Sequence, residues 1–185
     1  MADEAFTGRL LPGERIVWSG RPGQGVIFTG RDAFLVPFSL LWCGFAVFWT
    51  FSVTRVPGTP PFFALWGAMF VCIGLYFVAG RFVFDAWVRR GMSYALTDRR
   101  VLIARSAPSA NFTAVTLDRL PDAHLSEAAD GRGTIRFGAP AMAFGRSGLS
   151  IWSPALDPTP QFLAIDGARS VFDMIQRTTL ARGTS

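Results

Sequence analysis

Two long apolar runs joined by a short turn constrain this 185-residue chain more than any other feature. The runs cover residues 33–53 and 62–80, and the only charge within the whole stretch is Arg55, in the turn at residues 54–61. A helix of roughly 20 apolar residues is long enough to cross a hydrocarbon core of about 30 Å. The runs therefore predict two transmembrane helices, the second of which can extend as far as Arg90.

The rest of the chain is enough for one small soluble domain. Half of all residues are hydrophobic, and this surplus is concentrated in the two runs. We expect residues 92–185 to form the domain, because domains rarely contain fewer than about 50 residues. Residues 1–32 are predicted to form a polar segment with one strand. Their mixed charge is unlike a cleavable signal peptide, so we expect the hairpin itself to direct insertion.

The net charge of +5 is concentrated next to the second run. Residues 81–105 contain six arginines and two aspartates, whereas residues 106–185 contain seven arginines and seven acidic residues. Such a local surplus is typical of the cytoplasmic edge of a membrane protein. It predicts that both termini are cytoplasmic and that the loop is outside. It also favours membrane lipid, rather than nucleic acid, as a partner of the basic residues.

Four side chains near the ends of the runs are predicted to lie at the membrane interface. They are Trp49, Trp66, Arg81 and Trp87, since tryptophans gather at headgroup level and a terminal arginine can extend toward water. Arg81 is four residues before Asp85, a spacing that allows an ion pair on one helix face. The pair is interpreted either as an interfacial anchor or as an intramembrane functional site, and its position at the end of the run favours the anchor.

Small residues form a stripe on the second helix. Ala64, Gly67, Val71 and Gly74 recur at helical spacing, and small side chains let a second helix approach closely. The predicted partner is the first helix around Gly44. A homo-oligomer built through the same face is the alternative that the pattern leaves open.

The predicted soluble domain begins with short β-prone runs and ends with an amphipathic helix. Residues 92–185 contain six or seven such runs, separated by glycine and proline. The strands are expected at residues 92–97, 101–105, 112–117, 124–128, 134–137, 150–152 and 162–165. Another strand, at residues 16–18, should join them in one sheet, which would make the hairpin an insertion in the domain. Asp166 is predicted to cap a helix that ends near residue 181.

The chain lacks the usual catalytic and metal-binding patterns. It has one histidine, and its two cysteines, Cys43 and Cys72, are not part of a CxxC motif. Asp122, His124 and Ser126 are close in sequence, but a catalytic triad is normally assembled from different elements. No glycine-rich phosphate-binding loop is present. We therefore expect no enzyme activity, no metal and no cofactor.

Two stretches resemble a known family. The sequence LLPGERIVWSGRP at 10–22 precedes the hairpin, and YALTDRRVLI at 94–103 follows it. With GRGTIRFG at 131–138 and the final helix, this pattern resembles the bacterial pleckstrin-homology-like (PH-like) membrane proteins. The resemblance implies a membrane-anchored α+β protein of the bacterial inner membrane, with a small antiparallel split β-barrel closed by a C-terminal helix.

The resemblance and the charge distribution together imply a binding module. We expect a protein-interaction, assembly or regulatory factor at the inner face of the membrane, with an unidentified membrane or cytoplasmic protein as partner. The alternative is recognition of anionic lipid headgroups by Arg89, Arg90, Arg99 and Arg100. In eukaryotic relatives, basic residues around the first β-turn hold phosphoinositide phosphates, and the matching turn here includes Arg99 and Arg100.

Overall fold

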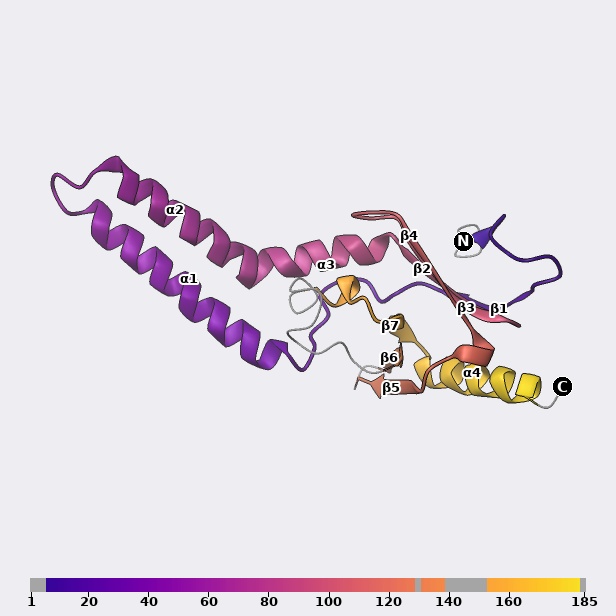
Figure 1. The fold of residues 1–185 in the computed structure, drawn as a ribbon. Coiled ribbons are helices and arrows are strands. Elements are labelled where there is room, and N and C mark those ends of the chain that lie inside the picture. The colour runs from indigo at the N-terminus through magenta and orange to yellow at the C-terminus, as the bar shows by residue number, and fades with distance from the viewer. Residues whose placement is uncertain (1–5, 129–130, 139–152, 184–185) are drawn as a thin grey trace. The chain divides into compact units, whose positions relative to one another are not determined.

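The computed structural model describes residues 6–128, 131–138 and 153–183, and it contains two compact units (Figure 1). One unit is a helical hairpin, residues 28–84. The other, which we call the sheet domain, combines the described residues before residue 28 with those after residue 84. The hairpin is therefore an insertion in the sequence of the sheet domain.

The hairpin contains two antiparallel helical segments that lie side by side (Figure 1). Helix α1 covers Asp32–Thr54, and α2 covers Pro61–Leu75. A π-helical turn, η2 (Tyr76–Gly80), links α2 to α3 (Arg81–Arg90), so the second run continues as helix to Arg90 as predicted. Both segments are long and apolar enough to cross a membrane. Only 22% and 11% of their most apolar windows are buried, unlike the core helix of a soluble protein.

The first sheet of the sheet domain joins strands from both sides of the hairpin. Strands β1 (Ile16–Gly20), β2 (Met92–Thr97), β3 (Arg100–Arg105) and β4 (Asn111–Thr116) are antiparallel neighbours in that order. In β1 and β2, Gly20 lies opposite Tyr94. The prediction that the strand before the first run joins the strands after the second run is confirmed.

The second sheet has the order β5-β6-β7. Its strands are β5 (Ala123–Glu127), β6 (Arg132–Phe137) and β7 (Gln161–Asp166), and short 3₁₀ helices occur at η3 (Leu117–Arg119) and η4 (Pro154–Leu156). Every strand predicted within the described residues is present, and the one predicted at residues 150–152 lies outside them. The class is α+β with two antiparallel sheets, and the described strands do not close into a barrel.

The C-terminal helix starts slightly later than predicted. Helix α4 covers Ala168–Gly183 and packs against β5 and β6. Asp166 is the last residue of β7 rather than a helix cap, because Gly167 adopts a φ of +61° and turns the chain between the two elements. The helix is amphipathic as predicted, and its apolar face is buried at Val171 and Ile175.

Both faces of the first sheet are covered, which explains why all six residues of β2 are buried. On one face, Tyr94 packs against Phe162 of β7 with 4.9 Å between ring centroids. On the other face, Ala95 and Leu102 pack around Phe6, which is fully buried. Side chains of a strand alternate between faces, so a strand with two covered faces buries the side chains on both of them.

Candidate functional site

A buried polar cluster lies within the sheet domain, next to the chain segments that lead into and out of the hairpin. The side chain of Arg89, in the last turns of α3, is completely buried. Its Nε donates to Asp85 Oδ2 at 2.7 Å, and its Nη2 donates to the carbonyl of Gly25 at 2.5 Å. Its Nη1 donates to the carbonyl of Gly23. We call this group, with Ser153, the junction cluster.

Asp85 completes the junction cluster with its second carboxylate oxygen. Oδ1 accepts hydrogen bonds from Ser153 Oγ at 2.8 Å and from the backbone N–H of Ala155 at 3.0 Å. Buried ion pairs are tolerated only when further hydrogen bonds satisfy both ions, as they do here. The cluster thus holds together α3, the segment before the hairpin and η4, which are far apart in sequence.

A bulge in β7 adds to these connections. The pairing of β6 and β7 shifts register, and the backbone at Ala164 adopts a φ of +46°. The displaced backbone groups find other partners: Leu163 donates to Tyr94 Oη at 3.2 Å, and Ala164 accepts from the N–H of Gly23 at 2.8 Å. Burial raises the pKa of the Tyr94 phenol above its ordinary value, which keeps it neutral. A Cβ on Gly23 would lie 2.7 Å from the Ala164 oxygen, so this contact requires glycine.

A second polar network surrounds the turn between β2 and β3. Arg100 binds the Glu14 carboxylate with Nε and Nη2, each at 2.8 Å. The same carboxylate accepts from Thr97 Oγ1 at 2.7 Å and from the N–H of Leu11 at 2.7 Å. These hydrogen bonds, chiefly the one from Arg100, lower the pKa of Glu14 to about 2. The two stretches that carry the family resemblance meet at this turn.

The four arginines predicted to contact lipid headgroups do not converge. Arg89 is engaged in the junction cluster and Arg100 in the Glu14 network, whereas Arg90 and Arg99 are exposed. Arg90 precedes β2 and Arg99 follows it, and a six-residue strand is about 20 Å long. Of the four, these two are the exposed ones, and they lie at opposite ends of one strand.

Arg81 pairs with a different residue from the one that its spacing suggested. Its Nη1 lies 2.7 Å from Asp32 Oδ1, at the start of α1, and its guanidinium lies over the ring of Phe82 at 4.3 Å. Asp85 is unavailable because it binds Arg89. Asp32 also accepts from the backbone and hydroxyl of Thr29. The Arg81–Asp32 pair therefore joins the two ends of the hairpin to each other.

The remaining predicted interface residues are the tryptophans. Trp66 and Trp87 are about half exposed, and Trp49 is half-buried. Trp49 and Trp66 also line a small apolar cavity between α1 and α2. Exposed apolar rings at the ends of apolar helices are suited to a membrane interface.

The small residues of α2 lie against α1. A Cβ on Gly67 would come within 2.4 Å of Thr50 Oγ1, and one on Gly74 within 2.9 Å of Cys43 Cβ. Gly44, in contrast, faces open space. The contact face of α1 is Cys43, Ala46 and Thr50 because these positions recur at helical spacing, and Gly44 is about 100° away from Cys43 around the helix.

The described part of the chain offers little converging catalytic chemistry. Within it, no three histidine, cysteine or acidic side chains are close enough to hold a metal ion. His124 lies on β5 opposite Arg136, and it is exposed together with Asp122 and Ser126. Sequence reasoning missed the roles of Glu14 and Arg89. The spacing of Asp85 and Arg89 was a usable signal for one of them, but nothing local marked Glu14.

Comparison of the chain with protein-family models, with curated proteins and with solved structures gave no match.

Proposed function

We propose that this chain is a membrane-tethered, PH-like binding module of the bacterial inner membrane, which holds its sheet domain at the cytoplasmic face to bind a membrane or cytoplasmic protein. The observation that carries the proposal is the insertion of an apolar hairpin between β1 and β2 of one sheet. The segment before the hairpin and the helix after it are hydrogen-bonded to each other in the junction cluster.

The surface of the hairpin supports a membrane location. Phe34, Leu41 and Leu65 are each more than 70% exposed, and they belong to many large apolar side chains on α1 and α2 that face outward. A contiguous apolar surface of this kind marks a site of contact with a membrane or with another protein. Lipid satisfies such a surface without any hydrogen-bonding partner, because the helices satisfy their own backbone groups.

The proposed orientation predicts the result of a topology experiment. A reporter that is active only in the cytoplasm should be active when fused after Ser185 and inactive when inserted at Pro57. The physical reason is the charge asymmetry, with one arginine in the loop and many on both flanks. Activity at Pro57 with none at Ser185 would reverse the proposed orientation, and activity at both would exclude a spanning hairpin.

The ends of the two sheets support a protein partner. β4 and β5 are the terminal strands of their sheets, and both are much more exposed than β2. A terminal strand offers backbone groups to which an extended segment of another protein can bind. These two strands therefore give the proposed partner a place to bind.

Photocrosslinking in native membranes tests this proposal. A photoreactive residue at Ala114, on β4, should give a discrete crosslinked protein, whereas one at Asp173, on the exposed side of α4, should give none. Equal labelling at both positions, or no labelling at Ala114 and at a second probe placed at Ser126 on β5, would contradict a partner at the sheet ends.

The alternative, recognition of anionic lipid, is favoured by the exposure of Arg90 and Arg99 in a segment of net charge +4. Hydrogen exchange of the full chain in nanodiscs separates the two functions. If the module binds protein, exchange at the turn that contains Arg99 should not depend on lipid charge. Protection that appears only with anionic lipid, weakens with salt and is lost in Arg99→Gln would favour the lipid alternative.

A further inference from the structure

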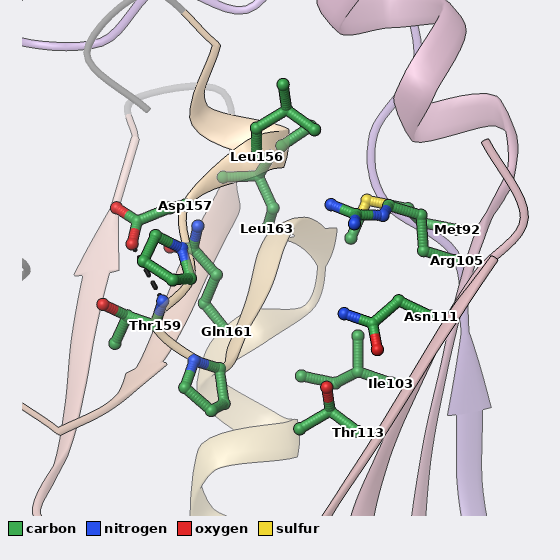
Figure 2. A pocket seen from close by; sticks show the side chains of 13 residues that line it. Met92, Ile103, Arg105, Asn111, Thr113, Leu156, Asp157, Thr159, Gln161 and Leu163 are labelled. Carbon is green, nitrogen blue, oxygen red and sulfur yellow. Dashed lines mark hydrogen bonds between the residues drawn. The ribbon is translucent and has the colours of Figure 1, made fainter. Parts of the chain in front are cut away.

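The sheet domain contains a cavity of about 210 Å³ between the first sheet and the segment that leads into β7 (Figure 2). One wall is formed by the ends of β2, β3 and β4, and the other by residues 155–161 with Leu163. For comparison, a cavity of about 150 Å³ in another protein is large enough to hold benzene. The cavity can therefore hold a small organic molecule.

Strand register explains why the cavity has polar walls at this end of the sheet. Pairing places the side chains of one face in three successive rows across β2, β3 and β4. The rows are Leu96–Val101–Val115, Tyr94–Ile103–Thr113 and Met92–Arg105–Asn111. The first row is entirely apolar, and only the last contains a charge. The face that packs on the second sheet thus ends in a row whose side chains border the cavity.

Among the described residues, Arg105 is the only cation that lines the cavity. Its Nε is buried and has no hydrogen-bond partner among the described residues. Figure 2 shows its guanidinium directed toward the opposite wall. A buried donor without an acceptor is unfavourable, and more so when it is charged, so this group is suited to receive an anionic oxygen.

Two polar side chains of the opposite wall, Asp157 and Gln161, already have partners. Asp157, the one acidic side chain in the described part of the lining, accepts with Oδ1 from the N–H of Thr159 at 2.9 Å. The amide of Gln161 donates to Pro154 O and accepts from Arg136. These hydrogen bonds hold the side chains of this wall in place. The Asp157 carboxylate disfavours a ligand with two negative charges, whereas Arg105 can balance a ligand with a single negative charge.

We propose that this cavity is a binding site for a small organic monocarboxylate. The carboxylate binds the Nε and Nη groups of Arg105, which match its two oxygens, and the amide of Asn111 lies in the same row to provide a further donor. The apolar body of the ligand lies against Met92, Ile103 and Leu163, which are each less than 10% exposed. The cavity borders β4, one of the strands proposed above to bind a protein, but the ligand contacts side chains of that strand rather than its free backbone edge.

Ligand-observed NMR on the full chain in detergent tests the proposal, with benzoate and hexanoate as probes. Both should bind saturably, with Kd near the millimolar range, and benzyl alcohol, which lacks the charge, should bind at least about tenfold more weakly. Inorganic phosphate should not compete. Empty micelles provide the baseline that corrects for partitioning into detergent.

Three variants locate the site. Arg105→Gln should weaken benzoate binding at least about tenfold, Arg105→Lys should weaken it less because the charge remains, and Arg99→Gln, on the exposed turn, should leave it unchanged. A thermal unfolding curve for each variant shows whether it is folded. If Arg105→Gln does not fold, the binding measured with Arg105→Lys tests the proposal instead. Absence of saturable binding by either acid, equal binding of benzyl alcohol, competition by phosphate, or unchanged binding in Arg105→Gln would each overturn the proposal.

Discussion

Replacing Arg89 with methionine should lower the free energy of unfolding of the sheet domain by about 4 kcal/mol, the usual cost of removing one partner of a buried ion pair. The substitution leaves the Asp85 carboxylate buried without a counter-ion. It also deprives the carbonyls of Gly23 and Gly25 of their donor. Chemical denaturation of the detergent-solubilised chain measures the change, and hydrogen exchange of β1 and β2 reports it locally.

Two further variants give this prediction its control. Arg90→Met removes the neighbouring, exposed arginine and should change stability by less than about 0.5 kcal/mol. The double variant Asp85→Asn/Arg89→Met should be more stable than Arg89→Met alone, because it no longer buries an unpaired charge. If Arg89→Met and Arg90→Met were equally stable, the junction cluster would not hold the domain together.

Replacing Glu14 with glutamine should lower the free energy of unfolding by about 3 kcal/mol at neutral pH, since the partly buried Arg100 guanidinium loses its counter-ion. The amide can still accept one hydrogen bond, but it cannot bind both Nε and Nη2 of Arg100. Urea denaturation at pH 7 measures the loss. The exposed pair Glu127–Arg169 provides a matched control, and Glu127→Gln should have little effect because that pair is open to solvent.

The pH dependence of this effect has a definite sign. The pKa of Glu14 is lowered from 4.5 to about 2 in the folded protein, so its contribution to stability is fully present above pH 4.5. It is lost as the pH falls from about 4.5 to about 2, because the carboxylate is then protonated in the unfolded chain first. The stability difference between wild type and Glu14→Gln should therefore shrink over this range. A difference that stays constant with pH would show that the carboxylate charge is not what stabilises the turn.

Local sequence patterns accounted for most of the secondary structure. The runs of apolar residues predicted both hairpin helices, and alternation with turn residues predicted every strand in the described part of the chain, including the weak one at β5. The helix of residues 168–183 followed from its apolar spacing. These signals work because each depends on residues that are neighbours along the chain, within a few turns of helix or one strand.

Local sequence patterns did not predict most of the ion-pair partners. The lipid alternative assigned headgroup contacts to Arg89 and Arg100, and the structure pairs these residues with Asp85 and Glu14 in the sheet domain. Arg81 was assigned to Asp85 by its spacing, yet it binds Asp32. A charged residue is usually exposed, so composition alone favours solvent for each of them.

The sequence by itself determined an apolar hairpin, its bounds and a small β-rich domain around it. The tertiary structure decided which arginines are internal. Apart from Asp85, which is four positions from Arg89, the partners described above for Arg81, Arg89 and Arg100 lie 49 to 86 positions away along the chain and meet them only in the folded protein. It also decided that Arg105 borders a cavity, since strand register fixes which row of side chains is last. Apolar periodicity is a property of neighbouring residues, whereas the pairing of buried charges depends on distances that exist only in the assembled fold.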